Sequence, residues 1–289
     1  MRPSPKIPAF LSTVLRGLGQ IMLQGSAATG LLFLAGITIG SPFMGLAALL
    51  AVCCGTGTAL LLRYDKAEVE QGLYGFSAAL VGVALVLFRG TGPEVWCAIG
   101  LGSALAAVLQ HFFIRRKIPA FTLPFVVITW VALTLLPAPA TAAATGEPAL
   151  LGGVWPAAVV RGFGQVIFQA GPVPGLLFIL GVAVHSRRAA AFGLASALLA
   201  ALLAMALERP EASVAMGLWS FNAVLCGIAL SGTGRRNILL ALVAVPLAVG
   251  IGMGMEPGPL PQLTFPFVAA TFMVLMGERL FGRRAPRAA

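Results

Sequence analysis

An internal duplication places the strongest constraint on the fold of this 289-residue chain. Residues 71–85 read QGLYGFSAALVGVAL and residues 216–230 read MGLWSFNAVLCGIAL, with eight of the fifteen positions identical. Three further pairs follow in the same order, RGLGQIMLQ (16–24) with RGFGQVIFQ (161–169), GLLFLAGI (30–37) with GLLFILGV (175–182), and FTLPFVVITW (121–130) with LTFPFVAATF (263–272). Self-similarity over most of a chain predicts repeated structural units, here residues 1–145 and 146–289, joined by a linker rich in Pro, Ala and Thr.

The composition indicates a membrane protein. Hydrophobic residues make up 59% of the chain and charged residues 10%, whereas soluble domains carry about 25% charged residues. The apolar runs are long, continuous and rich in Ala, Leu and Gly, which favours helices over the alternating pattern of a β-barrel. We therefore expect an all-α polytopic membrane protein.

The apolar segments predict how often each unit crosses the membrane. In the first unit they cover residues 7–25, 29–40, 43–62, 71–88, 95–114 and 120–137. Because a spanning helix needs about 20 apolar residues, segment 29–40 is too short, and Gly and Gln residues interrupt segment 7–25. We expect these two to share one broken or re-entrant crossing, which gives five crossings per unit. An odd number inserts the second unit upside down relative to the first, as an inverted-topology repeat.

Positive charge predicts the orientation. The net charge is +10, and with the N-terminus inside and five crossings per unit, every basic cluster falls on the cytoplasmic side. These clusters lie at residues 63–66, 115–117, 187–188, 235–236 and 279–287. We expect a multi-pass protein of the cell (inner) membrane with both termini cytoplasmic. No basic-aromatic patch occurs, so nucleic acid is not an expected partner.

Ionisable side chains are scarce within the apolar segments. The acidic residues and both histidines lie near segment ends, which argues against a proton relay. No nucleophile–base pair or metal-ligand spacing is apparent, so we expect neither an enzyme nor a bound metal or cofactor. The paired Arg16 and Arg161 are expected near opposite membrane faces, with their charged heads reaching water.

Neutral polar residues recur at equivalent positions. Thr122 and Thr264 occupy the paired TxPF motif, and Gln20 and Gln165 occupy the paired GQ motif. A threonine hydroxyl both donates and accepts, as does a glutamine carboxamide. Proline removes a backbone donor, so a freed carbonyl beside each threonine is a further expected oxygen. These groups predict a short ladder of oxygens in an uncharged passage.

Aromatic and aliphatic residues recur beside them. Phe76 precedes Leu80 by four residues, as Phe221 precedes Leu225, and residues four apart share a helix face. A slot with such walls would strip an ion of its hydration without compensating charge. A small, flat, neutral solute with several N–H donors would lose less. An ion-coupled secondary transporter of a small neutral amide or amino acid is the alternative, because backbone carbonyls can bind sodium.

Together, RGxGQ, GLLFLxGI, QGLYGFSAAL with GLWSFNAVL, and the paired TxPF resemble the urea transporter family from about residue 10 to 276, in its bacterial form. The resemblance implies passive urea channels that form homotrimers around a lipid-filled centre. It implies one central pore per subunit, built by two repeats of five transmembrane helices plus a tilted pore half-helix each. The half-helix is expected where the chain enters QGLYGF and MGLWSF.

The same resemblance implies roles for individual residues. The slot would be formed by Phe76, Leu80, Phe221 and Leu225, with Leu23 and Phe168 on its other side, the central hydroxyls by Thr122 and Thr264, and the outer urea contacts by Gln20 and Gln165. Two positions depart from the family pattern. Ser77 replaces an Asn that is kept as Asn222, and Leu23 stands where an aromatic residue would clamp urea better.

Overall fold

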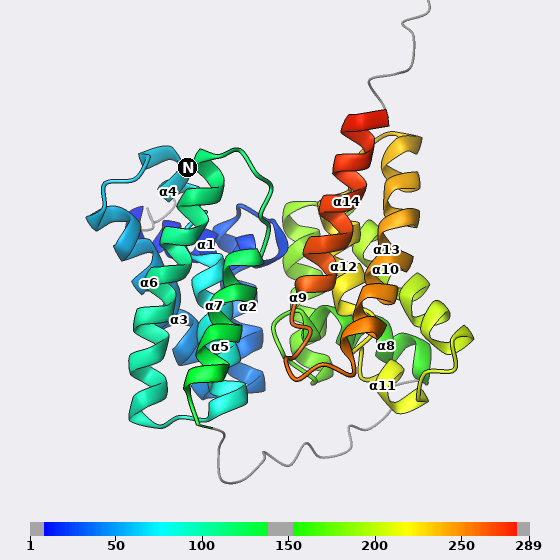
Figure 1. Ribbon diagram of the computed structural model, residues 1–289, viewed down its shortest axis with the longest axis horizontal. Helices are drawn as coiled ribbons and strands as arrows, with labels where there is room; N and C mark the ends of the chain where they lie inside the picture. Colours follow the sequence, from blue (N-terminus) through cyan, green and yellow to red (C-terminus); the bar gives the residue numbers. More distant parts are fainter. Residues whose placement is uncertain (1–8, 138–152, 282–289) are drawn as a thin grey trace, which may run out of the picture.

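The computed structural model describes residues 9–137 and 153–281, and every regular element within these two ranges is a helix (Figure 1). The all-α expectation is therefore confirmed for the described residues. The boundary expected between the two units, after residue 145, lies outside them.

The helices fall into two groups that lie side by side in Figure 1. The first group contains α1 (Ala9–Gly19), η1 (Gln20–Met22), α2 (Ala27–Gly40), α3 (Pro42–Leu61), α4 (Lys66–Glu70), α5 (Phe76–Arg89), α6 (Pro93–Arg115) and α7 (Leu123–Leu135). The second contains α8 (Val154–Gln165), α9 (Pro172–His185), α10 (Arg187–Ala206), α11 (Glu211–Ala215), α12 (Phe221–Ala229), α13 (Arg235–Met255) and α14 (Phe265–Phe281).

Equivalent residues begin equivalent helices. The Ser41 hydroxyl accepts a hydrogen bond from Met44 N at the start of α3, and the Ser186 hydroxyl accepts one from Ala189 N at the start of α10. Serine is a preferred N-cap because its side chain pairs an amide that has no partner within the helix. The two groups therefore share local start signals as well as motifs.

Four helices, α3, α6, α10 and α13, are long and apolar enough to cross a membrane. The segments 9–22 and 27–40 form a pair bent by 75° that together would make a fifth span. This bent pair lies where a broken or re-entrant crossing was expected. Since α5, α7 and α9 are apolar but shorter, the total of ten crossings stays a prediction.

Helices α2 and α9 pack against each other between the two groups. The rings of Phe33 on α2 and Phe178 on α9 meet edge to face with centroids 5.2 Å apart. Each ring lies over a glycine of the opposite helix, Phe178 over Gly36 and Phe33 over Gly181. The Thr29 hydroxyl also donates to the Gly181 carbonyl at 2.8 Å. Glycine permits this close approach because a Cβ atom would collide with the ring.

Helices α7 and α14 run in opposite directions (Figure 1). Both begin near the middle of the molecule, and α7 leads down to one face while α14 leads up to the other. Each is preceded by the threonine of the TxPF motif. This arrangement brings two helix starts together at mid-height.

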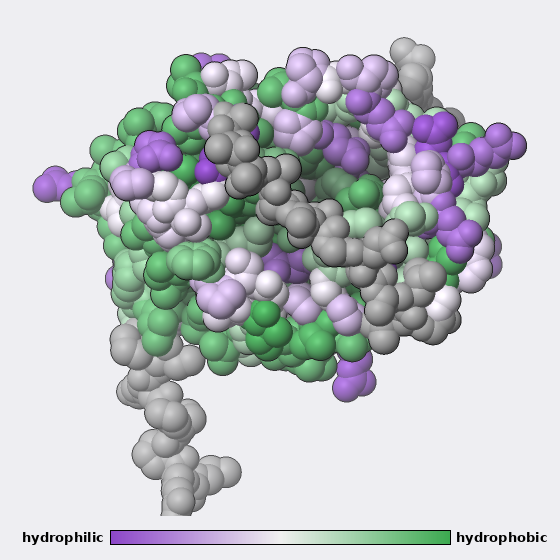
Figure 2. All heavy atoms as spheres, turned by 90° about the horizontal axis from the view of Figure 1, so that it is seen from below, coloured by the Kyte–Doolittle hydropathy of each residue, from purple (hydrophilic) through white to green (hydrophobic). Residues whose placement is uncertain are grey.

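The outer surface is largely apolar. Leu61, Leu101, Leu135 and Leu239 are among the exposed large hydrophobic side chains. Figure 2 shows hydrophobic residues covering one flank, with hydrophilic residues towards the centre and the opposite edge of the face in view. Lipid is as apolar as leucine, so such a flank is stable inside a bilayer.

Candidate functional site

The two threonines of the TxPF motifs meet in the interior. Thr122 Oγ1 and Thr264 Oγ1 lie 2.6 Å apart, a hydrogen bond that joins the two groups of helices. Both side chains are buried. Residues 142 positions apart in sequence thus form one polar contact at the point where α7 and α14 begin.

The prolines of these motifs lie in the first turns of α7 and α14. Pro124 lies in the first turn of α7, where the missing N–H has no intrahelical partner to lose. The Thr122 and Thr264 carbonyls accept hydrogen bonds from Val126 N and Val268 N, both at 3.1 Å. These two carbonyls are thus paired within the helices, and the hydroxyls are the groups that meet across the interface.

The residue before each threonine has a left-handed backbone. Phe121 has φ 48° and Leu263 has φ 46°, a region costly for side chains other than glycine. The Phe121 ring also lies 5.1 Å from the ring of Phe267 in the other group. The turn that presents the Thr122 hydroxyl is thus packed against the other group of helices.

The four residues predicted to form the slot lie on the first two turns of α5 and α12. Phe76 and Leu80 share one face of α5, Phe221 and Leu225 share one face of α12, and all four are buried. Short helices, α4 and α11, precede these turns at the positions expected for the pore half-helices. Side chains this buried can wall a narrow passage only if they move apart as a solute passes.

Gln20 and Gln165 are both partly exposed and bind the main chain in the same way. Gln20 Nε2 donates to the Gln71 carbonyl at 3.0 Å, and Gln165 Nε2 donates to the Met216 carbonyl at 3.1 Å. The acceptors, like the donors, are 145 positions apart. Each carboxamide therefore keeps its oxygen and one N–H for a solute.

The arginines of the same motif differ in burial. Arg16 donates to the Glu70 carbonyl at 3.0 Å and is partly exposed, whereas Arg161 donates to the Ala215 carbonyl at 3.2 Å and is only 2% exposed. For Arg161, the expectation that its head reaches water was wrong. It is the one charged side chain buried within the described residues.

Leu23 and Phe168 follow the glutamines of the RGxGQ motifs by three residues and have left-handed backbones, at φ 62° and 58°. Leu23 packs against the core, and the Phe168 ring lies 6.0 Å from Phe88 and 6.2 Å from Phe125, both in the first group. Phe168 thus spans the interface, whereas its equivalent is aliphatic.

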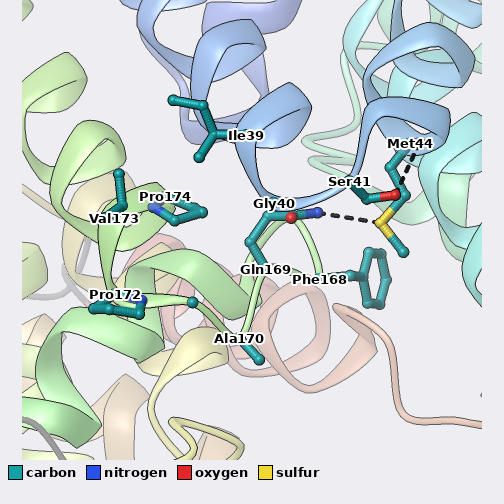
Figure 3. Close-up of a pocket in the computed structure, with 11 residues that line it drawn as sticks. Ile39, Gly40, Ser41, Met44, Phe168, Gln169, Ala170, Pro172, Val173 and Pro174 are labelled. Carbon is teal, nitrogen blue, oxygen red and sulfur yellow. Dashed lines mark hydrogen bonds between the residues drawn. The ribbon is translucent and has the colours of Figure 1, made fainter. Parts of the chain in front are cut away.

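A pocket of about 440 Å³ opens beside Phe168, between the α2–α3 junction and residues 168–174 (Figure 3). Gln169 reaches into it and its Nε2 contacts Met44 Sδ at 3.2 Å and donates to the Ile167 carbonyl at 3.0 Å. Its equivalent, Gln24, donates to the Met22 carbonyl at 2.7 Å. Sequence reasoning missed this buried pair, although both copies of the repeated nonapeptide end in Gln.

A cluster of polar rings holds α4 against α6. The Tyr74 hydroxyl lies 2.5 Å from Glu68 Oε2 and 2.9 Å from His111 Nδ1, and the Tyr64 ring stacks on His111 with centroids 3.6 Å apart. Burial raises the pKa of the Tyr64 hydroxyl. The cluster fixes the turn whose carbonyls bind Arg16 and Gln20.

The equivalent positions of the second group, each 145 residues later, carry different chemistry. Arg209 pairs with Glu256 at 3.0 Å and lies over the Trp219 ring, 5.6 Å from its centroid. Trp219 Nε1 donates to the Ser213 hydroxyl at 3.0 Å. An ion pair here replaces the tyrosine–histidine contacts, so the two ends of the molecule are held by different forces.

Comparison with known proteins covers nearly the whole chain. The sequence pattern of the urea transporter family matches residues 11–279. The chain is 26% identical to Urea transporter 1 of Ovis aries over 306 aligned positions, and to Urea transporter 1 of Rattus norvegicus over 303. Both alignments cover 96% of this chain and 79% of the relative. A match of this extent, on a helical fold with an uncharged polar centre, shows that the chain belongs to the urea transporter family.

Proposed function

We propose that this protein carries urea passively across a membrane, along a path between its two groups of helices. The observation that carries the proposal is the Thr122–Thr264 contact at 2.6 Å, in an interior where Arg161 is the one buried charge among the described residues. Two hydroxyls on facing elements suit a neutral solute that both donates and accepts hydrogen bonds. The family membership supports urea as that solute and transport, not catalysis, as the activity.

On this proposal, three types of residue line the path: glutamines, threonines, and aromatic or aliphatic residues. Gln20 and Gln165 lie at its two outer ends, and the threonine hydroxyls lie at its centre. Phe76, Leu80, Phe221 and Leu225 line the stretches between, with Leu23 and Phe168 opposite them. Urea is flat, so its faces suit aromatic and aliphatic walls while its N–H groups meet oxygens.

When urea passes the centre, the hydrogen bond between the two threonines is replaced by hydrogen bonds to urea, and no charged group is involved. The Thr122–Thr264 bond opens, and each hydroxyl then bonds to urea. Because a net hydrogen bond contributes only about 0.5–1.5 kcal/mol, such an exchange costs little. A cation would lose its hydration shell at a cost of several kcal/mol, and the described residues offer no buried carboxylate to replace it.

The protein is, on this proposal, a pair of inverted repeats, residues 1–145 and 146–289. The opposite directions of α7 and α14 support this, as do the contacts that recur 145 positions apart. The reciprocal Phe33 and Phe178 packing is what a two-fold relation produces, since each half then meets its own equivalent. Inverted repeats place a transport site at the midplane, where the threonines lie.

The positions of the basic residues and the apolar outer surface support an orientation in the membrane. With the expected crossings, the basic clusters all fall on one side, which supports both termini on the cytoplasmic side of the cell (inner) membrane. The exposed leucines face lipid or a neighbouring subunit, and the family resemblance supports a homotrimer. An ion-coupled mechanism is not favoured, because the comparisons support urea transport and the interior lacks a buried carboxylate among the described residues.

Stopped-flow light scattering of proteoliposomes tests the function. We expect urea to enter much faster than in empty vesicles, with a rate unchanged by collapse of sodium and proton gradients. Thr122→Val and Thr264→Val should each slow urea entry, whereas Thr56→Val, at a buried threonine on α3, serves as the matched control. Urea entry equal to that of empty vesicles would exclude the proposal.

A further inference from the structure

Asn222 fixes the backbone on both sides of Thr264. Its Nδ2 donates to the Leu263 carbonyl at 3.2 Å, and its Oδ1 accepts from Phe267 N at 3.1 Å. Leu263 has the left-handed φ of 46°, and Phe267 lies in the first turn of α14. One buried carboxamide thus stabilises the strained turn and pairs an amide at the helix start.

The equivalent position in the first group is Ser77, on α5. Helix α5 packs against α7, as α12 packs against α14. Ser77 is 1% exposed, and its hydroxyl has no hydrogen-bond partner among the described protein groups. It does not bond to a carbonyl of the preceding turn, which is the usual option for serine in a helix.

By equivalence to Asn222, Ser77 corresponds to the turn before α7, and that turn needs the same support as its counterpart. Phe121 has φ 48°, and Phe125 lies in the first turn of α7 as Phe267 does in α14. Serine has two fewer non-hydrogen atoms than asparagine, so its hydroxyl stops short of both groups. A buried hydroxyl left without a partner is costly, and such groups in proteins are commonly paired by internal water.

We propose that one water molecule binds beside Ser77 in the place that the Asn222 carboxamide fills in the other half. It accepts from the Phe125 amide and from the Ser77 hydroxyl and donates to the Phe121 carbonyl. Three polar partners are the usual number for a buried water. The donors and acceptors balance, since the water reproduces both bonds that Asn222 makes.

The water makes the two sides of the threonine contact unequal. Thr264 is supported by a covalently attached side chain, whereas Thr122 is supported by a molecule that exchanges. Ser77 is therefore a positioning residue. It influences how easily the turn at Phe121 moves when the Thr122 and Thr264 hydroxyls separate. This consequence rests on the proposed function, but the water site does not.

A high-resolution experimental structure of the full chain tests the site directly. We expect a density peak within about 3.2 Å of Ser77 Oγ, Phe121 O and Phe125 N, and no such peak in the Ser77→Asn variant, whose carboxamide takes its place. Density with no peak there, or with Ser77 bonded to a protein group instead, would overturn the proposal.

Thermal unfolding in detergent gives a second, independent readout. Ser77→Asn should raise the melting temperature by about 2–4 °C, and the reverse change, Asn222→Ser, should lower it by less than Asn222→Ala does, since only a hydroxyl can hold a substitute water. A fall in Ser77→Asn, or equal losses in the two Asn222 variants, would contradict the site. Urea entry is measured separately, so loss of the proposed function would leave these results intact.

Discussion

Phe33 and Phe178 are equivalent residues of the two halves, and they pack against each other with ring centroids 5.2 Å apart. Each ring fills the space over a glycine on the other's helix, Gly181 or Gly36. A residue that meets its own equivalent lies close to a local two-fold axis. The α2–α9 contact therefore lies where the proposed inverted repeat requires its two-fold axis.

Alanine at these glycines should weaken the contact between the halves. An added Cβ would come within 2.5 Å of the Phe178 ring at Gly36 and within 2.8 Å of the Phe33 ring at Gly181. We expect Gly36→Ala and Gly181→Ala each to cost about 1–3 kcal/mol of unfolding free energy, measured by thermal unfolding in detergent. Gly57→Ala on α3, where nothing lies within 4 Å, is the control and should be neutral or slightly stabilising.

The threonine pair should show energetic coupling. Thr122→Val or Thr264→Val alone leaves one hydroxyl without its partner, whereas the double variant removes both. A double-mutant cycle on thermal stability should give a coupling of about 0.5–1.5 kcal/mol. Additive losses would mean that the 2.6 Å contact contributes nothing to stability.

The two motif arginines should differ in importance. Arg161→Met removes a buried donor from the Ala215 carbonyl and should cost about 1–3 kcal/mol, because that carbonyl stays buried without this partner. Arg16→Met affects a partly exposed group that water can reach, so its loss should be smaller. Melting temperatures of the two variants, measured side by side, check the order, and equal losses would argue against it.

The Arg209–Glu256 pair should respond to salt. The side chains are 29% and 49% exposed, so the pair is worth only about 0–1 kcal/mol. Glu256→Gln should lower the melting temperature slightly in dilute buffer. The difference should vanish near 1 M NaCl, where the screening length is about 3 Å. A difference that persists there would mean that packing against Trp219 matters more than charge.

Much of the fold could be predicted from the sequence. Long continuous apolar runs predicted helices, and the duplicated motifs fold into matching local contacts, Gln20 with Gln71 and Gln165 with Met216. The break between α1 and α2 was visible in Gly17, Gly19 and Gln20. These signals depend on residues close together in the chain, so they can be recognised in the sequence without the structure.

Other features depend on contacts across the interface and could not be predicted. The burial of Arg161 depends on the packing of α11 and the following turn, since Arg16 carries the same local motif yet stays partly exposed. The Ser77 departure was visible in the sequence. Its consequence was not, because it depends on the groups that Asn222 reaches in the folded chain.

The opposed starts of α7 and α14 have an electrostatic consequence. Each helix carries a dipole equivalent to roughly half a positive charge at its N-terminus. Because both helices begin at the threonines, two such partial charges face the same point from opposite sides. That point repels cations and attracts an electronegative atom such as a carbonyl oxygen, and this preference comes from backbone orientation, before any side chain is considered.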